Sequence, residues 1–483
     1  MRTLICCLLV LLTAACGASG PPRTLAPALT PPQITTAVAP IIATTAPPQP
    51  TPAPISPVPV GLIFAQVQYP APGIRVIDTH GNAAPRMLPA GVPAPDWSTL
   101  YTASYDGTHT QVAALDPLTG AVLRTTFLDQ VYQFRTTSLA QSYQFQWDDD
   151  DGVTGAGRTS PDGRWLALTG SHEYHADGRV LSRFAVLDTA FTQSPRTLVL
   201  NGTYSFDAIA NDGQTLYLIE HLPVEQVTAT PAPGTSAPPR YRVVLVDLLH
   251  PTDTPQVLID KTTQGAVMAG TRQSAVVMPD GQWLFSLYLN PKQPFIHALD
   301  LTHHFAVCIF LPAATGDPAS QGHWALTRTP DARRLYAANS TTGTVVEIDA
   351  ASLSTLRTVH LTPDAPHAAN PLAAVAAWFA PWHVAAKGDR MATGIAVTPD
   401  GSTLVMSGGQ GLTFVDTRDL QVRTRVLTNQ HFGNVLMSAD GQRLYAANGD
   451  AGTLVVLDPV SGAMRDTIPL GSDLWEITLL RAT

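Results

Sequence analysis

Two short stretches of the sequence hold residue types that bind metal ions. His172, Glu173 and His175 lie within four consecutive positions and offer imidazole and carboxylate groups, which zinc and copper accept as ligands. The acidic run 148–151 offers clustered carboxylates, which suit calcium, but it lacks the alternate spacing and terminal glutamate of an EF-hand loop. The histidines fall in a predicted loop without helical register. The candidate metal ligands are therefore His172, His175, Asp148 and Asp150, and solvated polar loops are the alternative interpretation.

A second set of side chains is suited to hold an organic ligand. Arginine, histidine and aromatic residues recur where the innermost strands of the repeat described below begin, and further tryptophans lie in the adjoining loops. Arginine and histidine donate charge-assisted hydrogen bonds to anions, and aromatic rings stack on sugar-like groups. The alternative is that these side chains bond one another and water. The ligand-binding candidates are Arg158, Tyr204, Arg272, His323, Trp324, Trp378, Trp382, Arg390, His431 and Trp475.

Several catalytic motifs are missing from the sequence. It contains no Gly-x-Ser-x-Gly elbow, no Gly-rich phosphate loop with lysine, and no Cys-x-x-Cys-His haem motif. Cys308 lies in the apolar run 305–311, which predicts a buried strand. Burial raises the pKa of a thiol, so Cys308 is interpreted as a core residue rather than a nucleophile. We therefore name no catalytic residue.

The N-terminal residues 1–15 have the features of an export signal. Arg2 gives a positive start, and an apolar run follows that is shorter than the roughly 20 residues needed to span a bilayer. The run ends in Thr13-Ala14-Ala15-Cys16-Gly17, which resembles the bacterial lipobox, in which the cysteine is lipidated after cleavage. This resemblance predicts lipidation of Cys16. A plain secretory signal with an incidental cysteine is the alternative.

The next segment, 16–60, is rich in proline, threonine and alanine. It holds 13 of the 42 prolines of the chain and almost no charge. Such a tract cannot bury a core and favours extended polyproline II conformations, at about 3.1 Å per residue. We predict a disordered tether between the lipidated cysteine and the folded part.

Two landmarks recur from residue 61 onward. The first is an Asp-Gly turn between apolar runs, a strong hairpin signal because glycine accepts a positive φ. It occurs at Asp162, Asp212, Asp280, Asp400 and Asp440, and Asp331-Ala332 is a degenerate copy. The second landmark is a strand that ends in aspartate, which occurs at Asp78, Asp116, Asp188, Asp247, Asp300, Asp349, Asp416 and Asp458. Each unit thus predicts four short antiparallel strands, as in the blades of a β-propeller.

The best copies of this repeat, within 329–361 and 438–471, resemble the YVTN-type propeller family. Its pattern is a Pro-Asp-Gly turn, then Leu-Tyr-Val-Ala-Asn, Val-Ile-Asp and Thr-Ile-Pro-Val-Gly; here the second copy contains Leu444-Tyr445-Ala446-Ala447-Asn448. The resemblance covers about residues 61–480. It implies an all-β propeller but not a function, because this fold hosts unlike roles.

The repeat also predicts how the ring closes. The first unit, 61–91, lacks its opening strand, and the orphan strand 474–480 follows the last unit. Pairing the two would remove both exposed edges. We therefore predict an eight-bladed propeller over 61–483, with seven blades as the alternative.

Long insertions concentrate on one face of this predicted ring. In propeller topology the connections after strand 4 and between strands 2 and 3 share a face, and long connections mark functional loops more often than not. The long ones here are 129–158, 170–182, 221–240, 312–324 and 362–392. The Asp-Gly turns and the turns after each strand-ending aspartate fall on the opposite face and are short.

Charge and composition narrow the function. A net charge of −9 and a pI near 5.8 exclude a typical nucleic-acid binder. We expect a monomeric lipoprotein, anchored to the bacterial membrane by lipid alone and facing outside the cytoplasm, that binds a protein or glycan partner through its long-loop face and needs no cofactor. The alternative is a propeller enzyme, either a lactonase-like hydrolase or a metal- or cofactor-dependent oxidoreductase. Its site would lie at the channel mouth and draw on His172, His175, His323, His383 and His431.

Overall fold

The computed structural model describes most of the repeat region. The described residues are 61–67, 73–81, 84–134, 158–222, 240–251, 254–290, 293–313, 323–361, 394–408, 411–448, 451–470 and 477–483. They all belong to one compact unit, Ile55–Thr483; a second unit, Met1–Pro54, contains the predicted signal, Cys16 and most of the tether. The described residues form strands β1 to β34 and no α-helix, so none of them forms a membrane-spanning helix.

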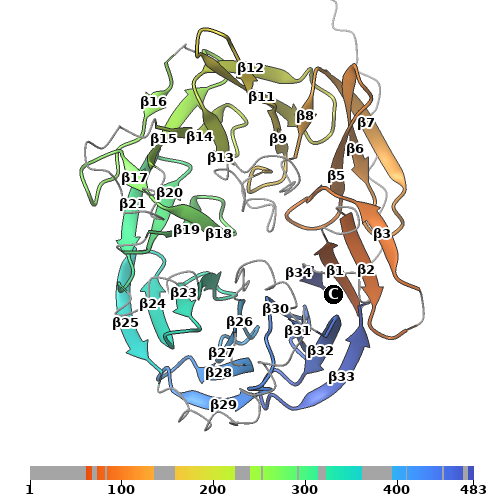
Figure 1. Ribbon diagram of the computed structural model, residues 1–483, viewed down its shortest axis with the longest axis vertical. Helices are drawn as coiled ribbons and strands as arrows, with labels where there is room; N and C mark the ends of the chain where they lie inside the picture. The colour runs from red at the N-terminus through yellow and green to blue at the C-terminus, as the bar shows by residue number, and fades with distance from the viewer. Residues whose placement is uncertain are drawn as a thin grey trace, which may run out of the picture. The chain divides into compact units, whose positions relative to one another are not determined.

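Eight antiparallel sheets are arranged around a central axis as the blades of a propeller (Figure 1). From the axis outward, the first four blades have the following strands. Blade 1 holds β34 (Ile477–Ala482), β1 (Leu62–Val67), β2 (Gly73–Asp78) and β3 (Arg86–Pro89); blade 2 holds β4 (Val92–Pro93), β5 (Leu100–Tyr105), β6 (His109–Leu115) and β7 (Val122–Asp129); blade 3 holds β8 (Tyr132–Gln133), β9 (Trp165–Gly170), β11 (Val180–Asp188) and β12 (Arg196–Asn201), with the extra strand β10 (Glu173–Tyr174); blade 4 holds β13 (Tyr204–Ile209), β14 (Thr215–His221), β15 (Arg240–Asp247) and β16 (Gln256–Val257), with the extra strand β17 (Met268–Ala269).

Blades 5 to 8 follow the same order without extra strands. Blade 5 holds β18 (Thr271–Val277), β19 (Trp283–Leu289), β20 (Phe295–Asp300) and β21 (Phe305–Phe310); blade 6 holds β22 (Trp324–Arg328), β23 (Arg334–Asn339), β24 (Thr344–Asp349) and β25 (Ser354–His360); blade 7 holds β26 (Ile395–Val397), β27 (Thr403–Gly408), β28 (Gly411–Asp416) and β29 (Val422–Val426); blade 8 holds β30 (Val435–Met437), β31 (Leu444–Asn448), β32 (Thr453–Leu457) and β33 (Met464–Pro469). The predicted all-β, eight-bladed fold is confirmed.

The ends of the described chain close the ring, as predicted. The C-terminal strand β34 is the innermost strand of blade 1 and pairs antiparallel with β1, from Ile63 opposite Ala482 to Val67 opposite Ile477. Beyond this ladder, the Gly61 N–H donates to the Thr483 carbonyl at 2.8 Å, and the Thr483 N–H donates to the Leu62 carbonyl at 2.9 Å. The pairing covers the inner edge of β1, and β34 takes the innermost position of blade 1 that β4 takes in blade 2.

The repeated aspartates close the turns of one face. At the end of the third strand of every blade, the aspartate side chain accepts a backbone N–H from two to five residues ahead, as between Asp458 and Ser461 (2.8 Å). In the Asp-Gly turns the aspartate accepts an N–H two residues ahead and often a hydroxyl two residues back, as from Ser438 to Asp440 (2.6 Å). These turns therefore satisfy their own polar groups and need no external ligand.

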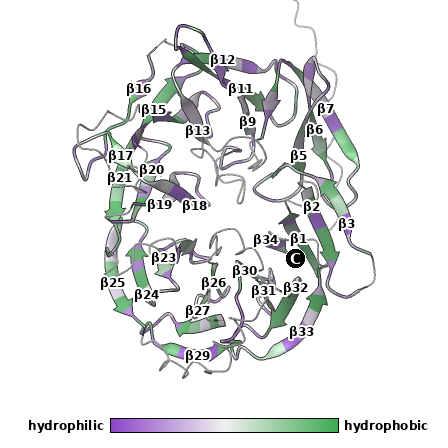
Figure 2. Cartoon of the chain, in the orientation of Figure 1, coloured by the Kyte–Doolittle hydropathy of each residue, from purple (hydrophilic) through white to green (hydrophobic). Residues whose placement is uncertain are grey.

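Each interface between neighbouring blades is filled by one apolar cluster or more. The alternation along a middle strand explains how: on β14, Leu216 and Leu218 pack toward blade 3, and Tyr217 between them packs toward blade 5. Strands buried on both sides read as nearly continuous apolar runs, which accounts for much of the low charge of the chain. Figure 2 shows this hydrophobic colouring along middle strands such as β1 and β32.

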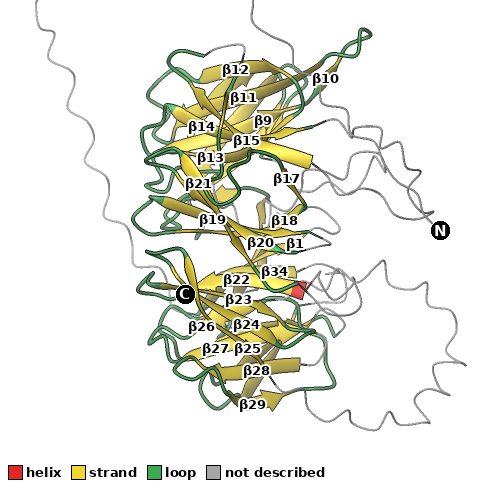
Figure 3. Cartoon of the chain, turned by 90° about the vertical axis from the view of Figure 1, so that its left-hand side faces the viewer, coloured by secondary structure: helices red, strands yellow, loops and turns green. Residues whose placement is uncertain are grey.

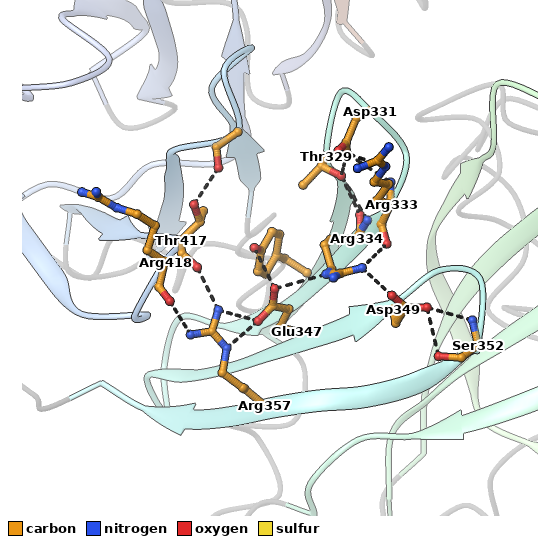
Figure 4. Close-up of polar contacts among 12 residues, drawn as sticks. Thr329, Asp331, Arg333, Arg334, Glu347, Asp349, Ser352, Arg357, Thr417 and Arg418 are labelled. Carbon is orange, nitrogen blue, oxygen red and sulfur yellow. Dashed lines mark hydrogen bonds and ion pairs between the residues drawn. The ribbon is translucent and has the colours of Figure 1, made fainter.

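Arginines on outermost strands fasten several blades to the next one. In blade 6, the Arg357 side chain bonds the buried Glu347 carboxylate (2.6 Å) and donates to the carbonyls of Thr417 (2.9 Å) and Arg418 (2.7 Å) in blade 7 (Figure 4). The same contact from an outer-strand arginine to a carbonyl in a short turn of the following blade is made by Arg86 to Pro117, Arg124 to Thr189 and Arg196 to Gly213. Polar contacts thus supplement the apolar interfaces at this face.

The degenerate turn at Ala332 allows a test of how the hairpins are built. Ala332 has φ +58°, where the other turns have glycine. Ala332→Gly should stabilise the protein by about 0.5 to 1 kcal/mol, because relief of the left-handed strain outweighs the greater freedom of glycine in the unfolded chain. The measurement is the free energy of unfolding in urea.

The matched control is Gly401→Ala in the equivalent turn of blade 7. Gly401 has φ +73°, and an added Cβ would meet no atom within 4 Å, so only backbone strain would change. We expect a loss of about 1 kcal/mol. A change in the free energy of unfolding that has the same sign in both variants would contradict this account.

Candidate functional site

The two faces of the propeller differ in what connects their strands. The Asp-Gly turns and the turns after the strand-ending aspartates lie together on one side of the ring and are short (Figure 3). The longest connections, 135–157, 223–239, 314–322 and 362–393, all join strand ends of the opposite side, which we call the long-loop face. These four segments lie outside the described residues. The described part of the long-loop face comprises the starts of the innermost strands and several shorter connections.

At the junction of blades 3 and 4, two predicted ligand residues hold the blades together. The Arg158 side chain is buried, donates to the Thr169 hydroxyl at 3.1 Å, and lies 5.0 Å over the Phe206 ring of blade 4. Tyr204, the first residue of β13, is also buried, and burial raises its pKa. Its carbonyl oxygen lies 3.1 Å from Nε2 of His172 in blade 3. These residues are therefore occupied by contacts between blades.

Arg272 lies at the junction of blades 4 and 5, near the start of β18. It forms an ion pair with Asp207 of β13 at 3.1 Å, and the two side chains are only 9% and 1% exposed. Truncating one partner of such a buried pair generally costs about 3 to 5 kcal/mol, because the other charge is left in a low dielectric. Arg272 thus has a structural partner in the neighbouring innermost strand.

Two further predicted ligand residues lie at the start of blade 6. Trp324, the first residue of β22, is 4% exposed and packs in the apolar cluster between blades 5 and 6, with residues such as Leu311 and Leu326. His323 immediately precedes it and is half-buried. Nδ1 of His323 is buried and has no hydrogen-bond partner among the described residues.

The candidate metal ligands of blade 3 lie on an extended hairpin. The predicted loop contains β10, which pairs with the start of β11. His175 pairs with Glu173 at 3.2 Å, and Glu173 also pairs with Arg183, whereas His172 faces Tyr204. Within the described ranges, no group of three or more His, Cys, Asp or Glu side chains is placed to hold a metal ion. The described residues therefore do not bring the two histidines together with a third ligand.

His431 lines a cleft of about 510 Å³ between blades 7 and 8. The loop before β30 forms one wall, and β32, β33 and the connection after β31 form the other. Asn448 positions the two walls: its Nδ2 donates to Oε1 of Gln430 at 2.9 Å, and its Oδ1 accepts the Ala451 N–H at 3.0 Å. The lining residues are Asn429, Gln430, His431, Asn448, Ala451, Thr453, Val455, Met464 and Thr467.

Sequence reasoning found only His431 among the residues of this cleft. Asn448 belongs to the repeat motif, so its position in the sequence indicated a structural role and not a binding role. Its counterpart in blade 6, Asn339, does have such a role, because its side chain accepts the N–H groups of Thr341 and Thr342 in its own turn. Asn429 and Gln430 form a dipeptide that no local pattern marks as part of a cleft. A second cleft, of about 370 Å³, lies at the opposite face beside the Asp162 turn.

The remaining candidates lie outside the described residues. They are Cys16, Asp148, Asp150, Trp378, Trp382, His383, Arg390 and Trp475.

The described residues define an eight-bladed β-propeller. No known protein family and no curated protein matches the sequence. Among solved structures, the chain is similar to dihydro-heme d1 dehydrogenase NirN in complex with DHE (15% identity, TM-score 0.44, 87% of this chain and 75% of that chain). It is also similar to apo AztD from Citrobacter koseri (11%, 0.44, 87% and 98%). A third similar structure is the periplasmic gluconolactonase PpgL of Pseudomonas aeruginosa (17%, 0.36, 80% and 99%).

Blade 5, which contains Arg272 on β18, also contains a buried histidine on β20. His297 on β20 is 2% exposed, and burial lowers its pKa from 6.5 to about 4; the Asp260 carboxylate opposes this shift and Arg272 adds to it. His297 is therefore neutral in the folded protein at neutral pH. Its unfolded form takes up a proton below pH 6.5, so acid favours unfolding.

We expect this histidine to contribute a pH dependence of stability. Its contribution is present above pH 6.5 and is lost as the pH falls toward 4, by about 2 kcal/mol between pH 7 and pH 5. The measurement is the free energy of unfolding in urea against pH, for the wild type and His297→Gln. The variant should lose that part of the slope, and His250→Gln, at a side chain that is 82% exposed, should keep it. An unchanged slope in His297→Gln would contradict the assignment.

Proposed function

We propose that this protein is an exported, lipid-anchored binding scaffold whose propeller recognises a glycan through its long-loop face. One observation carries the proposal: the cleft at His431 is lined by residues of two connections on the long-loop face, 429–431 and the connection after β31. The opposite face consists of short turns closed on themselves, and its cleft beside the Asp162 turn is smaller, at about 370 Å³.

The lining of the cleft favours a neutral saccharide. Its side chains include three amides, two hydroxyls and one imidazole, and no Asp, Glu, Lys or Arg. Amides and hydroxyls both donate and accept, as sugar hydroxyls do. Val455, Ala451 and Met464 add apolar atoms to the lining, which suit the carbon face of a sugar ring. The volume of about 510 Å³ falls within the usual range of ligand sites.

The binding test uses two exposed residues of the cleft, Asn429 and His431. The full chain would first be screened on a printed array of neutral oligosaccharides, and the best ligand measured by calorimetry. We expect Asn429→Ala and His431→Ala together to weaken binding by at least about 10-fold, through loss of hydrogen bonds to the sugar.

The control is His250→Ala, at an exposed turn of the opposite face, which should bind as the wild type does. The absence of any array ligand for the wild type would sink the glycan proposal. Full affinity in the double variant would show that the glycan binds elsewhere on the molecule.

The anchor is supported by the N-terminal sequence alone. The apolar run and Thr13-Ala14-Ala15-Cys16 have the composition of a lipoprotein signal, and the proline-rich segment 17–60 would hold the propeller away from the membrane. A displayed binding face and a tethered base are compatible, because a lipid anchor leaves the propeller free to meet its partner.

Replacing Cys16 tests the anchor. In the native host, Cys16→Ala should abolish incorporation of an alkyne-labelled fatty acid and shift the protein from the membrane to the soluble fraction. Cys308→Ser, which removes a buried thiol of the propeller, should keep both label and location. Labelling that persists in Cys16→Ala would contradict lipidation at this residue.

A further inference from the structure

The cleft on the face opposite the long loops lies between blades 2 and 3. Its volume is about 370 Å³, and it is lined by the turns 94–99 and 161–163 together with Tyr101, Arg124 and Thr189. This volume falls within the usual range of small-ligand sites. All of the lining residues are described by the structure, so the walls can be compared directly with those of the next junction.

The turn 94–99 is the counterpart of the Asp-Gly turn of blade 3. In both turns the N–H of the first residue donates to the carbonyl of the sixth, at 2.8 and 2.9 Å. Trp97 takes the place of the glycine with φ +62°, and its ring packs on that of Phe64 in blade 1, with centroids 4.9 Å apart. Arg481 of β34 donates to the Asp96 carbonyl at 2.8 Å. A bulky residue at a positive φ persists only where its surroundings hold it, so blade 1 fixes this wall of the cleft.

Two small residues leave the cleft open. Ser98 and Thr99 stand in blade 2 where blade 3 has Arg164 and Trp165. At the junction of blades 3 and 4, the Arg164 side chain donates to a carbonyl of the next turn at 3.0 Å. The Trp165 ring lies so close to that turn that a Cβ added at Gly213 would be 2.0 Å from it. These two large side chains therefore fill at blades 3 and 4 the space that stays open at blades 2 and 3.

Arg124 brings a positive charge into the cleft. Its Nε donates to the Thr189 carbonyl at 2.9 Å. The residue opposite it on β6 is Ala114, whereas the equivalent arginine of blade 6, Arg357, lies opposite Glu347 and bonds its carboxylate at 2.6 Å. Among the described residues Arg124 forms no ion pair, so the anionic group of a ligand can meet its charge.

Asp96 brings a negative charge into the same cleft. Its Oδ1 accepts the Ser98 N–H at 2.9 Å. In blade 3 the equivalent Asp162 also accepts a serine hydroxyl from two residues back and pairs with Arg164, both at 2.5 Å. In blade 2 the residue two back is Ala94, which has no hydroxyl, and Ser98 replaces the arginine. Asp96 forms no ion pair within the part of the chain that the structure describes, so its carboxylate can accept from a cationic group of a ligand.

We propose that this cleft binds a free α-amino acid with a small side chain. An α-amino acid carries a carboxylate and an ammonium group on one carbon atom. The Nη groups of Arg124 donate to that carboxylate, and the Asp96 carboxylate accepts from the ammonium. Asp96 would repel a simple anion and Arg124 a simple cation, so a zwitterion is favoured over either.

The rest of the lining agrees with a small ligand. The hydroxyls of Ser98 and Thr99 suit a polar side chain such as that of serine, and Pro95 and Pro161 suit a methyl group or a hydrogen. The site lies on the opposite face from the cleft at His431. The inference therefore does not depend on the proposed glycan site.

The test is calorimetric titration of the purified full chain with glycine, alanine and serine, and with acetate and methylammonium as the separate halves of glycine. We expect the best of the three amino acids to bind at least about 10-fold more tightly than either half. Asp96→Asn and Arg124→Gln each remove one charge and should each weaken binding by at least about 10-fold. Ser98→Arg, which restores the pattern of blade 3, should abolish binding.

Arg196→Gln is the matched control. Arg196 is the equivalent outer-strand arginine of blade 3 and makes a similar contact, to the Gly213 carbonyl at 2.7 Å, so its loss should leave the affinity unchanged. The proposal would be overturned if none of the three amino acids bound, if acetate bound as tightly as the best of them, or if Arg196→Gln lost as much affinity as Arg124→Gln. Should Arg124→Gln fail to fold, Asp96→Asn decides, because that side chain is exposed, and unchanged affinity there would overturn the site.

Discussion

The antiparallel ladder between β1 and β34 is the contact on which the ring depends. In blades 2 to 8 the strands follow one another along the chain, so local hairpins build each sheet. Blade 1 alone joins segments from the two ends of the propeller, across a sequence separation of 421 residues between Leu62 and Thr483. The cluster between blades 8 and 1 includes both Ile63 and Ala482, so the eighth interface is complete only after this pairing. The loop-closure cost rises only slowly with length, which lets one short ladder hold so large a ring.

Closure has a consequence for how the faces are used. Closure lets the interfaces between blades bury both surfaces of the middle strands, and the outermost strands, such as β33 and β25, carry many exposed residues. The short-turn face is held by the repeated aspartates and by arginines such as Arg124 and Arg357 that reach the next blade. The long-loop face also carries contacts between blades, at Arg158 and at the Arg272–Asp207 pair. Both faces therefore contribute to holding neighbouring blades together.

Features that depend on neighbours in sequence were predictable, and features that depend on the next blade were not. The aspartate turns and the burial of Cys308 follow from local patterns, and the closing strand follows from the count of strands over the whole repeat; the structure confirms all three. Arg158 and Arg272 are predicted to face a ligand, and local patterns do not reveal the contacts that the two also make with the Phe206 ring and Asp207 of blade 4. Residue type shows that a buried guanidinium needs a partner, but the identity of that partner depends on how blades pack. The cleft at His431 was found only in part for the same reason.

The junction of blades 4 and 5 shows how a regular repeat acquires a distinct chemistry. Near the axis this junction holds the buried Asp207–Arg272 pair, and farther out it holds a cluster of Tyr241, Tyr288, Phe295 and Cys308, with Met268 packed against it. The ion pair is costly to bury unless its charges are matched, and the 3.1 Å contact between Arg272 and Asp207 provides that match. The outer cluster needs little compensation of this kind, because thiol, thioether and aromatic carbon atoms are largely apolar. The same junction can therefore combine a polar inner contact with an apolar outer one, since each is satisfied within the two blades that form it.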